Sequence, residues 1–339
     1  MIGNAVVDIW EAEGVFPVAK YEDDLKAFRF PTPNGPFVDG DFRYDYDRAE
    51  MLRRVSPLNV PWHEEKGDDS FTFITTFIGY LWDIPQKKVS LPEPKRLKFH
   101  ERVRRFLISF GNQPCTMRDV EKIHGSLCHV AFVHLDGRSH LPSLSNFAAS
   151  FHGDEFITRR PPHSMITDLN WWLMKLSQPN VARTLHPHGP LQDLGLYVDA
   201  STSWGIGIVI GDEWAAFRLS PSWEVPGRDI CWLETVAIEL LVYFLEAKGL
   251  RDTHLLIHSD NQGTIGALEK GRSGNVHINL SIRRTHLVLM DLSIATRTIY
   301  VESHANPADP ISRGEPGSTG KQLIPTFKLP DELLCLLNV

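Results

Sequence analysis

The sequence lacks the long apolar runs that membrane-spanning helices need, since no stretch approaches roughly 18 consecutive apolar residues. Its N-terminus also lacks the basic-then-apolar pattern of a secretory signal. We therefore expect an intracellular protein, cytoplasmic or nuclear, with no membrane partner. Cysteine is scarce, and its four positions are too scattered for a paired metal site: Cys115, Cys128, Cys231 and Cys335. Reduced thiols are the expectation.

What is present is an ordinary globular composition, with 42% hydrophobic and 23% charged residues, which argues against general disorder. A length of 339 residues suggests two or three domains. The net charge of −7 is unevenly distributed, at −8 for residues 1–83, +7 for 84–190 and −6 for 191–339. A basic middle between acidic ends fits a nucleic-acid track joining two metal sites. A randomly charged surface is the alternative.

The most informative stretch is LLIHSDNQGTIGA, residues 255–267. Its apolar start predicts a buried strand, which ends at Asp260, and Asn261 can cap the helix that follows. An acid at the carboxyl end of a central strand lies where open α/β sheets bind ligands. A plain helix cap would look the same, so the interpretation depends on other acids nearby.

The surrounding pattern predicts strands over 195–201, 205–211, 214–219, 255–259 and 296–303, with helices over 232–248 and 276–292 and a short one from Asp309. Three further acids fall in this region: Asp199 within a strand, Glu234 near the head of the long helix, and Asp309 after Pro307. Carboxylates from separate segments can hold two divalent ions about 3.5–4 Å apart, the arrangement that phosphodiester hydrolysis uses.

This order of elements and acids resembles ribonuclease H over about residues 195–315, with VDAS at Asp199, E-x-x-A at Glu234 and NPADPISR around Asp309. The resemblance implies an α/β (α+β) fold with a mixed five-stranded sheet. It also implies two Mg²⁺ ions, with Mn²⁺ as an alternative. Asp199 would bridge them, Glu234 and Asp260 would hold the leaving-group ion, and Asp309 the other. Glu239 is the runner-up for Glu234.

The same resemblance implies an RNA–DNA hybrid as the nucleic-acid partner, recognised through 2′-hydroxyls across a shallow minor groove. Asn261, Asn306 and Arg313 are the expected nucleic-acid contacts. His304 lies near the place where some family members have a mobile histidine that aids product release, and a plain loop histidine is the alternative.

Near the N-terminus, a helix closed by Gly14 precedes a predicted hairpin whose turn carries YEDD. Adjacent aspartates at a turn are costly unless a divalent cation lies beside them. The motif resembles the Y-x-D-D of reverse transcriptases, with Tyr21, the metal ligands Asp23 and Asp24, and Lys66 matching the family's proton donor. Residues 73–82 resemble the primer-gripping hairpin and 87–98 the basic hinge to the thumb.

The palm-like part departs from the family in two ways. Only twenty residues precede the motif, so the third palm aspartate and the fingers are not found, and Asp8 lies on the predicted helix. Glu22 stands where the family usually has an apolar residue. The expectation is that this chain alone does not polymerise DNA. Whether a second chain supplies the fingers and the rest of the palm stays open.

The resulting division is a partial palm over 1–92, a helical thumb or connection over 93–190, a ribonuclease H-like domain over 191–315 and a tail over 316–339. Residues 153–164 and 179–190 are predicted linkers, and Thr116 with Asp119 predicts a capping box. The leading interpretation is a fragment of a retroelement reverse transcriptase, of LTR or DIRS type, with ribonuclease H activity. A catalytically inactive nucleic-acid-binding relic and a different nuclease on the same fold are the alternatives.

Overall fold

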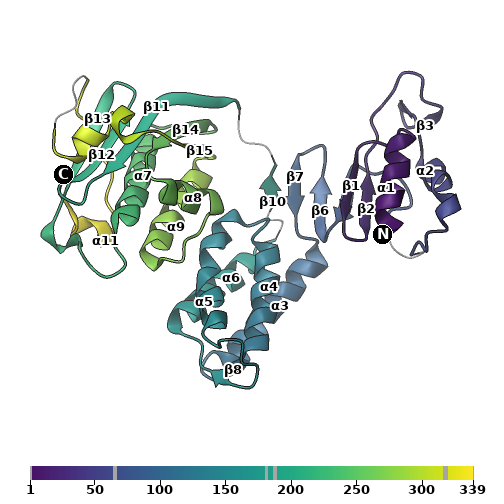
Figure 1. The fold of residues 1–339 in the computed structure, drawn as a ribbon, viewed down its shortest axis with the longest axis horizontal. Coiled ribbons are helices and arrows are strands. Elements are labelled where there is room, and N and C mark those ends of the chain that lie inside the picture. Colours follow the sequence, from purple (N-terminus) through teal and green to yellow (C-terminus); the bar gives the residue numbers. More distant parts are fainter. Residues whose placement is uncertain (1, 64–66, 180–181, 186–188, 316–319, 339) are drawn as a thin grey trace. The chain divides into compact units, whose positions relative to one another are not determined.

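A computed structural model of the chain describes residues 2–63, 67–179, 182–185, 189–315 and 320–338 (Figure 1). These residues form two compact units. The first contains the chain up to residue 95 together with 182–185, and the second contains 96–179 and the chain from 189 onward. Among the described residues, no helix is long and apolar enough to cross a membrane.

The first unit begins with the predicted helix, α1 (Ile2–Ala12), which buries Val6 and Trp10. Strands β1 (Val18–Tyr21) and β2 (Asp24–Ala27) then pair antiparallel, with Tyr21 opposite Asp24. The predicted hairpin is therefore confirmed, and YEDD forms its turn. Glu22 adopts a φ of +53°, a left-handed conformation that non-glycine residues seldom adopt.

A second small hairpin and a helix follow: β3 (Phe37–Asp39), β4 (Phe42–Tyr44), α2 (Arg48–Arg54) and η1 (Ser56–Leu58). Helix α2 begins only at Arg48, because Tyr44 pairs with Phe37 in the hairpin. Asp47 caps the helix by accepting a hydrogen bond from the backbone N–H of Glu50.

Residues 73–82 contain an antiparallel hairpin, formed by β5 (Ile74–Phe77) and β6 (Tyr80–Asp83), with Gly79 at the turn at a φ of +78°. It belongs to a four-stranded antiparallel sheet completed by β7 (Lys88–Ser90) and β10 (Ala182–Thr184). The prediction that 179–190 is only a linker was therefore wrong. A three-residue strand whose partner lies about ninety positions earlier leaves too short an alternation to recognise.

Helices form the first part of the second unit: α3 (Glu93–Phe110), α4 (Met117–Val130), η2 (Leu135–His140), α5 (Pro142–Ala149) and α6 (His163–Ser177). The predicted capping box at Thr116 and Asp119 is confirmed. Residues 153–164 are not wholly linker, because β9 (Thr158–Arg159) pairs with β8 (Cys115–Thr116).

The rest of the second unit is a mixed sheet with the order β15-β14-β11-β12-β13-β16. Strand β11 pairs in parallel with β14, which pairs in parallel with β15, and the other pairings are antiparallel. This is the predicted α/β fold with a mixed sheet. The strands are β11 (Leu191–Ala200), β12 (Gly205–Ile210), β13 (Glu213–Leu219), β14 (His254–Ser259), β15 (Ala295–Tyr300) and β16 (Leu337–Asn338).

Helix α7 (Ile230–Ala247) lies across one face of this sheet (Figure 1), and all of its residues from Trp232 to Leu245 are buried. Helix α9 (Val276–Asp291) packs against it, and α8 (Gln262–Lys270) follows β14 directly. The long apolar run of α7 thus provides the centre of the core, which includes Phe217, Leu241 and Ile282.

The opposite face carries the short helix α10 (Asp309–Ser312) over β12, after η4 (Ser303–Ala305). Gly207 of β12 makes this close packing feasible. A Cβ there would lie 2.4 Å from the Ala308 carbonyl oxygen and 2.6 Å from the Ser312 nitrogen. Because Gly207 pairs directly with Asp199 of β11, this packing brings α10 beside that aspartate.

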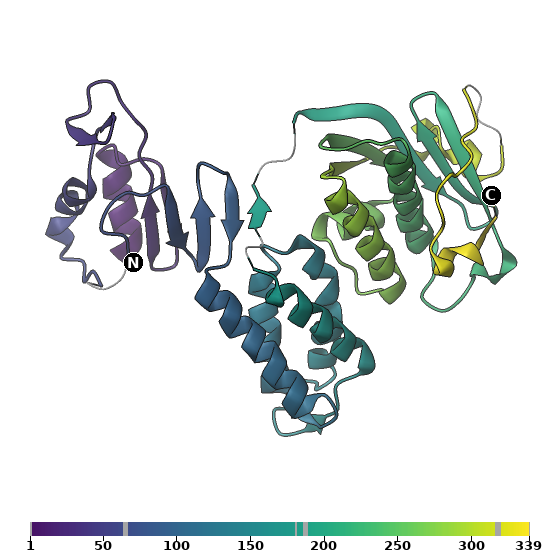
Figure 2. The same cartoon turned by 180° about the vertical axis from the view of Figure 1, so that it is seen from behind.

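The C-terminal segment adds a sixth strand that the five-stranded prediction did not include. Strand β16 pairs with β13, and α11 (Asp331–Leu334) precedes it. Between β13 and α7, η3 (Pro221–Trp223) contributes Trp223 to the same core. Viewed from behind, the yellow segment lies along the sheet edge (Figure 2). Its buried leucines join the core: Leu329, Leu333, Leu336 and Leu337.

Candidate metal centre

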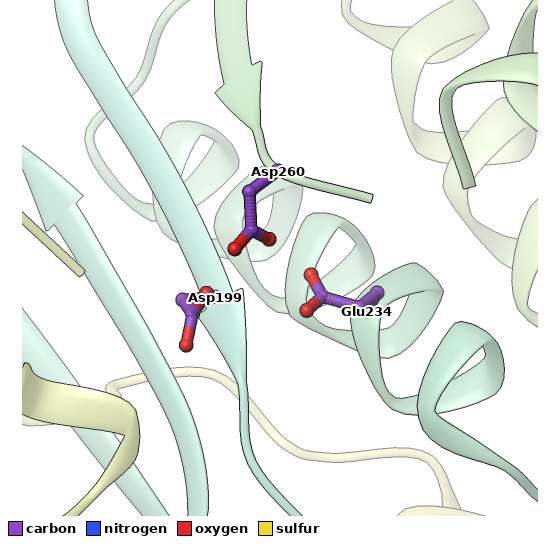
Figure 3. Close-up of side chains that lie close together, drawn as sticks. All are labelled: Asp199, Glu234 and Asp260. Carbon is purple, nitrogen blue, oxygen red and sulfur yellow. The ribbon is translucent and has the colours of Figure 1, made fainter. Parts of the chain in front are cut away.

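Three acids from three different elements meet at one edge of the sheet (Figure 3). Asp199 is the penultimate residue of β11, Asp260 follows β14 directly, and Glu234 lies near the start of α7. Because β11 and β14 run in parallel, the two aspartates reach the same edge. One carboxylate oxygen from each of the three residues lies within 4.8 Å of the others.

Asp199 is 3% exposed, and its carboxylate is held on both sides. The Ser312 hydroxyl donates to its Oδ2, and the Asn306 amide lies 3.4 Å from its Oδ1. The pKa of Asp199 is raised to about 7, chiefly by burial and also by the neighbouring charges of Asp260 and Asp309. The hydrogen bond from Ser312 acts in the opposite direction.

Glu234 is similarly buried and only half satisfied. Its Oε1 accepts a hydrogen bond of 3.1 Å from the backbone N–H of Ala200, whereas its buried Oε2 has no hydrogen-bond partner among the described residues. Burial, followed by the charges of Asp199 and Asp260, raises the pKa of Glu234 to about 9. Burying a carboxylate oxygen without a hydrogen-bond partner costs free energy, and a bound cation would supply the missing partner.

These features fit a divalent cation. The donors are hard carboxylate oxygens, which Mg²⁺ and Mn²⁺ prefer. Burial and then repulsion between the carboxylates raise the pKa values of Asp199 and Glu234, and a cation bound by these carboxylates would relieve both effects. Asp199, Glu234 and Asp260 are the residues that would hold it.

Asp309, the fourth predicted acid, lies beside this cluster and outside the set of three. Its carboxylate accepts a hydrogen bond of 2.8 Å from Arg313, and Ser303 lies 3.3 Å away. The Arg313 hydrogen bond lowers the pKa of Asp309. The structure therefore brings three of the four acids together and leaves the fourth paired with an arginine.

Residues predicted to contact nucleic acid lie in different settings. Arg313 is exposed and paired with Asp309. His304, for which the prediction was a role in product release, is exposed and lies 3.4 Å from Glu302. Asn261 caps α8 by accepting from the N–H of Thr264. Asn306 is buried, and its side chain donates to the Val198 carbonyl over 2.9 Å.

Glu239, the runner-up for Glu234, is fully buried elsewhere on α7. Its carboxylate accepts hydrogen bonds from Tyr243, Ser281 and Arg284. It therefore has a full set of partners and lies outside the acid cluster.

The polymerase-like residues lie at an exposed turn. Tyr21, Asp23 and Asp24 are all exposed, and Lys66 lies outside the described residues. Within the part of the chain that the structure describes, no group of three metal-ligating side chains forms at this turn.

Sequence reasoning missed Ser312, which contacts Asp199 directly. The NPADPISR motif contains this serine, but only the packing of α10 on Gly207 reveals that its hydroxyl faces the aspartate.

No family model matches the chain, and no curated protein matches it. Among solved structures it is similar to ribonuclease H1 from the halophilic archaeon Halobacterium salinarum, at 14% identity and a TM-score of 0.28, over 36% of this chain and 94% of that one. It is also similar to the foamy viral protease–reverse transcriptase in complex with double-stranded DNA, at 14% identity and a TM-score of 0.33, over 87% of this chain and 48% of that one. The same viral protein in complex with RNA/DNA hybrid gives 13% identity and a TM-score of 0.33, over 88% and 37%. The chain thus spans less than half the length of both viral chains.

Proposed function

We propose that this chain is a divalent-metal-dependent ribonuclease H that cleaves the RNA strand of RNA–DNA hybrids. The observation that carries the proposal is the convergence of Asp199, Glu234 and Asp260 at the end of two parallel strands. Three buried or half-buried carboxylates with a partnerless oxygen among them are costly in a purely structural role. The resemblance of their sequence motifs to ribonuclease H supports the same function.

In this proposal each acid has its own part. Bound Mg²⁺ ions, or Mn²⁺, would lower the pKa of a water and stabilise the leaving oxygen. Asp199 would contact both ions, while Glu234 and Asp260 would hold the ion on the leaving-group side. Asp309 would hold the other ion after releasing Arg313, and His304 on its exposed loop would aid product release.

We further propose that the ribonuclease H-like part belongs to a reverse transcriptase of retroelement type, LTR or DIRS. The YEDD turn and the hairpin β5–β6 support a palm-like first unit, and α3 to α6 support a thumb-like bundle. We propose no polymerase activity for the chain itself, because Asp23 and Asp24 have no third ligand among the described residues. A second chain that supplies fingers would be the corresponding partner.

A specific observation favours a second candidate function, nucleic-acid binding without cleavage. Arg313 holds the carboxylate of Asp309 in the present arrangement. If that pair does not open, only three acids are available and the second ion has fewer ligands.

The test is cleavage of an end-labelled RNA–DNA hybrid with Mg²⁺, using the wild type beside Asp260→Asn. The substitution removes a metal-binding charge at a half-buried position, so we expect loss of RNA cleavage beyond the roughly 10–100-fold typical of residues around metal ligands. RNA–RNA and DNA–DNA duplexes of the same sequence should stay intact. Binding of the hybrid without cleavage by the wild type would favour the second candidate, and cutting of DNA would contradict both.

A further inference from the structure

The hydroxyl of Ser312 contacts the candidate metal ligand Asp199 directly. It is fully buried at the end of α10, and its Oγ donates to Oδ2 of Asp199. The same Oγ lies 2.9 Å from the carbonyl oxygen of Asp309, three residues earlier in the helix.

The two acceptors around Ser312 compete for a single proton. A serine hydroxyl has one O–H to donate, and its hydrogen rotates to suit the surroundings. A carboxylate is the stronger acceptor, so the hydroxyl points at Asp199 while that group is otherwise unligated. When a cation binds Oδ2 of Asp199, the Ser312 hydroxyl can donate to the Asp309 carbonyl instead.

Asp199 needs such support, because like charges surround it. Asp260 and Asp309 both disfavour its ionised form. On its other side, Asn306 donates to the Val198 carbonyl and lies 3.4 Å from Oδ1. With contacts to both oxygens, the carboxylate has little freedom to rotate away from its neighbours.

Building on the proposed ribonuclease H function, we propose that Ser312 is a positioning residue. It holds Asp199 in its metal-binding orientation before the ions bind, and it transfers its hydrogen bond to the Asp309 carbonyl once they are bound. The hydroxyl thereby preorganises Asp199 for metal binding. Once the ions are bound, the Asp309 carbonyl accepts its hydrogen bond, so the buried hydroxyl is not left without an acceptor.

The test compares Ser312→Ala with the wild type by calorimetric titration with Mg²⁺ alone and by the Mg²⁺ dependence of hybrid cleavage. We expect Mg²⁺ affinity to fall about 3- to 10-fold, the net effect of one hydrogen bond. The cleavage rate at saturating Mg²⁺ should fall less than the Mg²⁺ affinity does, because the bound ions then orient Asp199.

Ser177→Ala is the matched control. Ser177 also ends a helix and bonds the carbonyl three residues earlier, that of Met174, but it is exposed and far from the acids in sequence. It should leave Mg²⁺ affinity unchanged. Unfolding of both variants in EDTA tests whether Ser312 has a purely structural role. Such a role would change the unfolding midpoint without changing the Mg²⁺ affinity of the folded protein.

The outcomes separate the two proposals. If the wild type cleaves hybrid and Ser312→Ala binds Mg²⁺ as tightly as it does, the positioning role is overturned and the ribonuclease H function stands. An equal loss of affinity in Ser177→Ala also overturns that role. A wild type that binds no Mg²⁺ overturns both.

Discussion

Glu234 and Glu239 show how residue type and position alone leave a functional assignment incomplete. Both are buried glutamates on α7, five positions apart. The E-x-x-A motif pointed to Glu234, and the structure places it with Asp199 and Asp260. Glu239 is instead matched by Arg284, a partner 45 positions later that the sequence does not link to it. The set of partners distinguishes a ligand from a structural carboxylate.

At this scale the raised carboxyl pKa values predict an unusual pH dependence of stability. The pKa of Glu234 is about 9 in the fold, above its ordinary 4.5, and that of Asp199 is about 7, above 3.8. At pH values between the ordinary and the folded pKa of each group, the folded state therefore binds more protons than the unfolded state. The contribution of these two carboxyl groups to stability is fully present below about pH 4, and it is lost as pH rises through their folded pKa values.

We therefore expect the unfolding midpoint in EDTA to fall between pH 5 and pH 8, and Mg²⁺ at pH 8 to restore it, because the ion binds the ionised carboxylates. Glu234→Gln should flatten the dependence and unfold at a higher temperature than wild type at pH 8. Thermal melts of both proteins across this range measure the effect. The prediction is contradicted if the unfolding midpoints of the wild type and of Glu234→Gln change with pH in the same way.

Individual elements were predictable where their patterns are long. The apolar run of α7 and the strand ending at Asp260 follow directly from residue spacing. Strands β10 and β16 were not predictable, because they have three and two residues and depend on partners far away in the sequence. The placement of α10 also required the structure, since it depends on the absence of a side chain at Gly207.

The tail offers a prediction at the scale of the element. Leu333 of α11 is fully buried in the core, whereas the adjacent Leu334 is 49% exposed. Leu333→Ala should cost about 2–5 kcal/mol of stability through lost burial and a residual cavity. Leu334→Ala should change stability by less than about 0.5 kcal/mol. Chemical denaturation of both variants measures the difference, and equal effects would show that the tail does not pack as described.

At the scale of the molecule, the helical bundle and the six-stranded mixed sheet belong to one compact unit. Arg283 of α9 donates to the Ser139 carbonyl over 2.8 Å and to Asp168 over 2.9 Å. Asp168 is buried and also bonds His140 and Ser143. Sequence analysis placed a boundary near 190 and had no means to pair residues more than a hundred positions apart.

Arg283→Ala should therefore weaken this contact. Removing the guanidinium leaves a buried carboxylate short of one charged donor, a loss of about 1.5–3 kcal/mol. Arg251→Ala is the control, because Arg251 forms an exposed pair with Asp291 at 3.5 Å, a kind that contributes about 0–1 kcal/mol. Differential scanning calorimetry should show a lower or split transition for Arg283→Ala only. Matching scans for the two variants would contradict the role of Arg283.

The most direct test of the central claim, that the acid cluster is a hydrolytic metal site, is hybrid cleavage by Glu234→Gln and Glu239→Gln beside the wild type. The account predicts that Glu234→Gln folds normally yet loses RNA cleavage. It predicts that Glu239→Gln, which breaks a buried ion pair worth roughly 3–5 kcal/mol on removal of one partner, is less stable yet cleaves wherever it remains folded. Undiminished cleavage by folded Glu234→Gln would contradict the account.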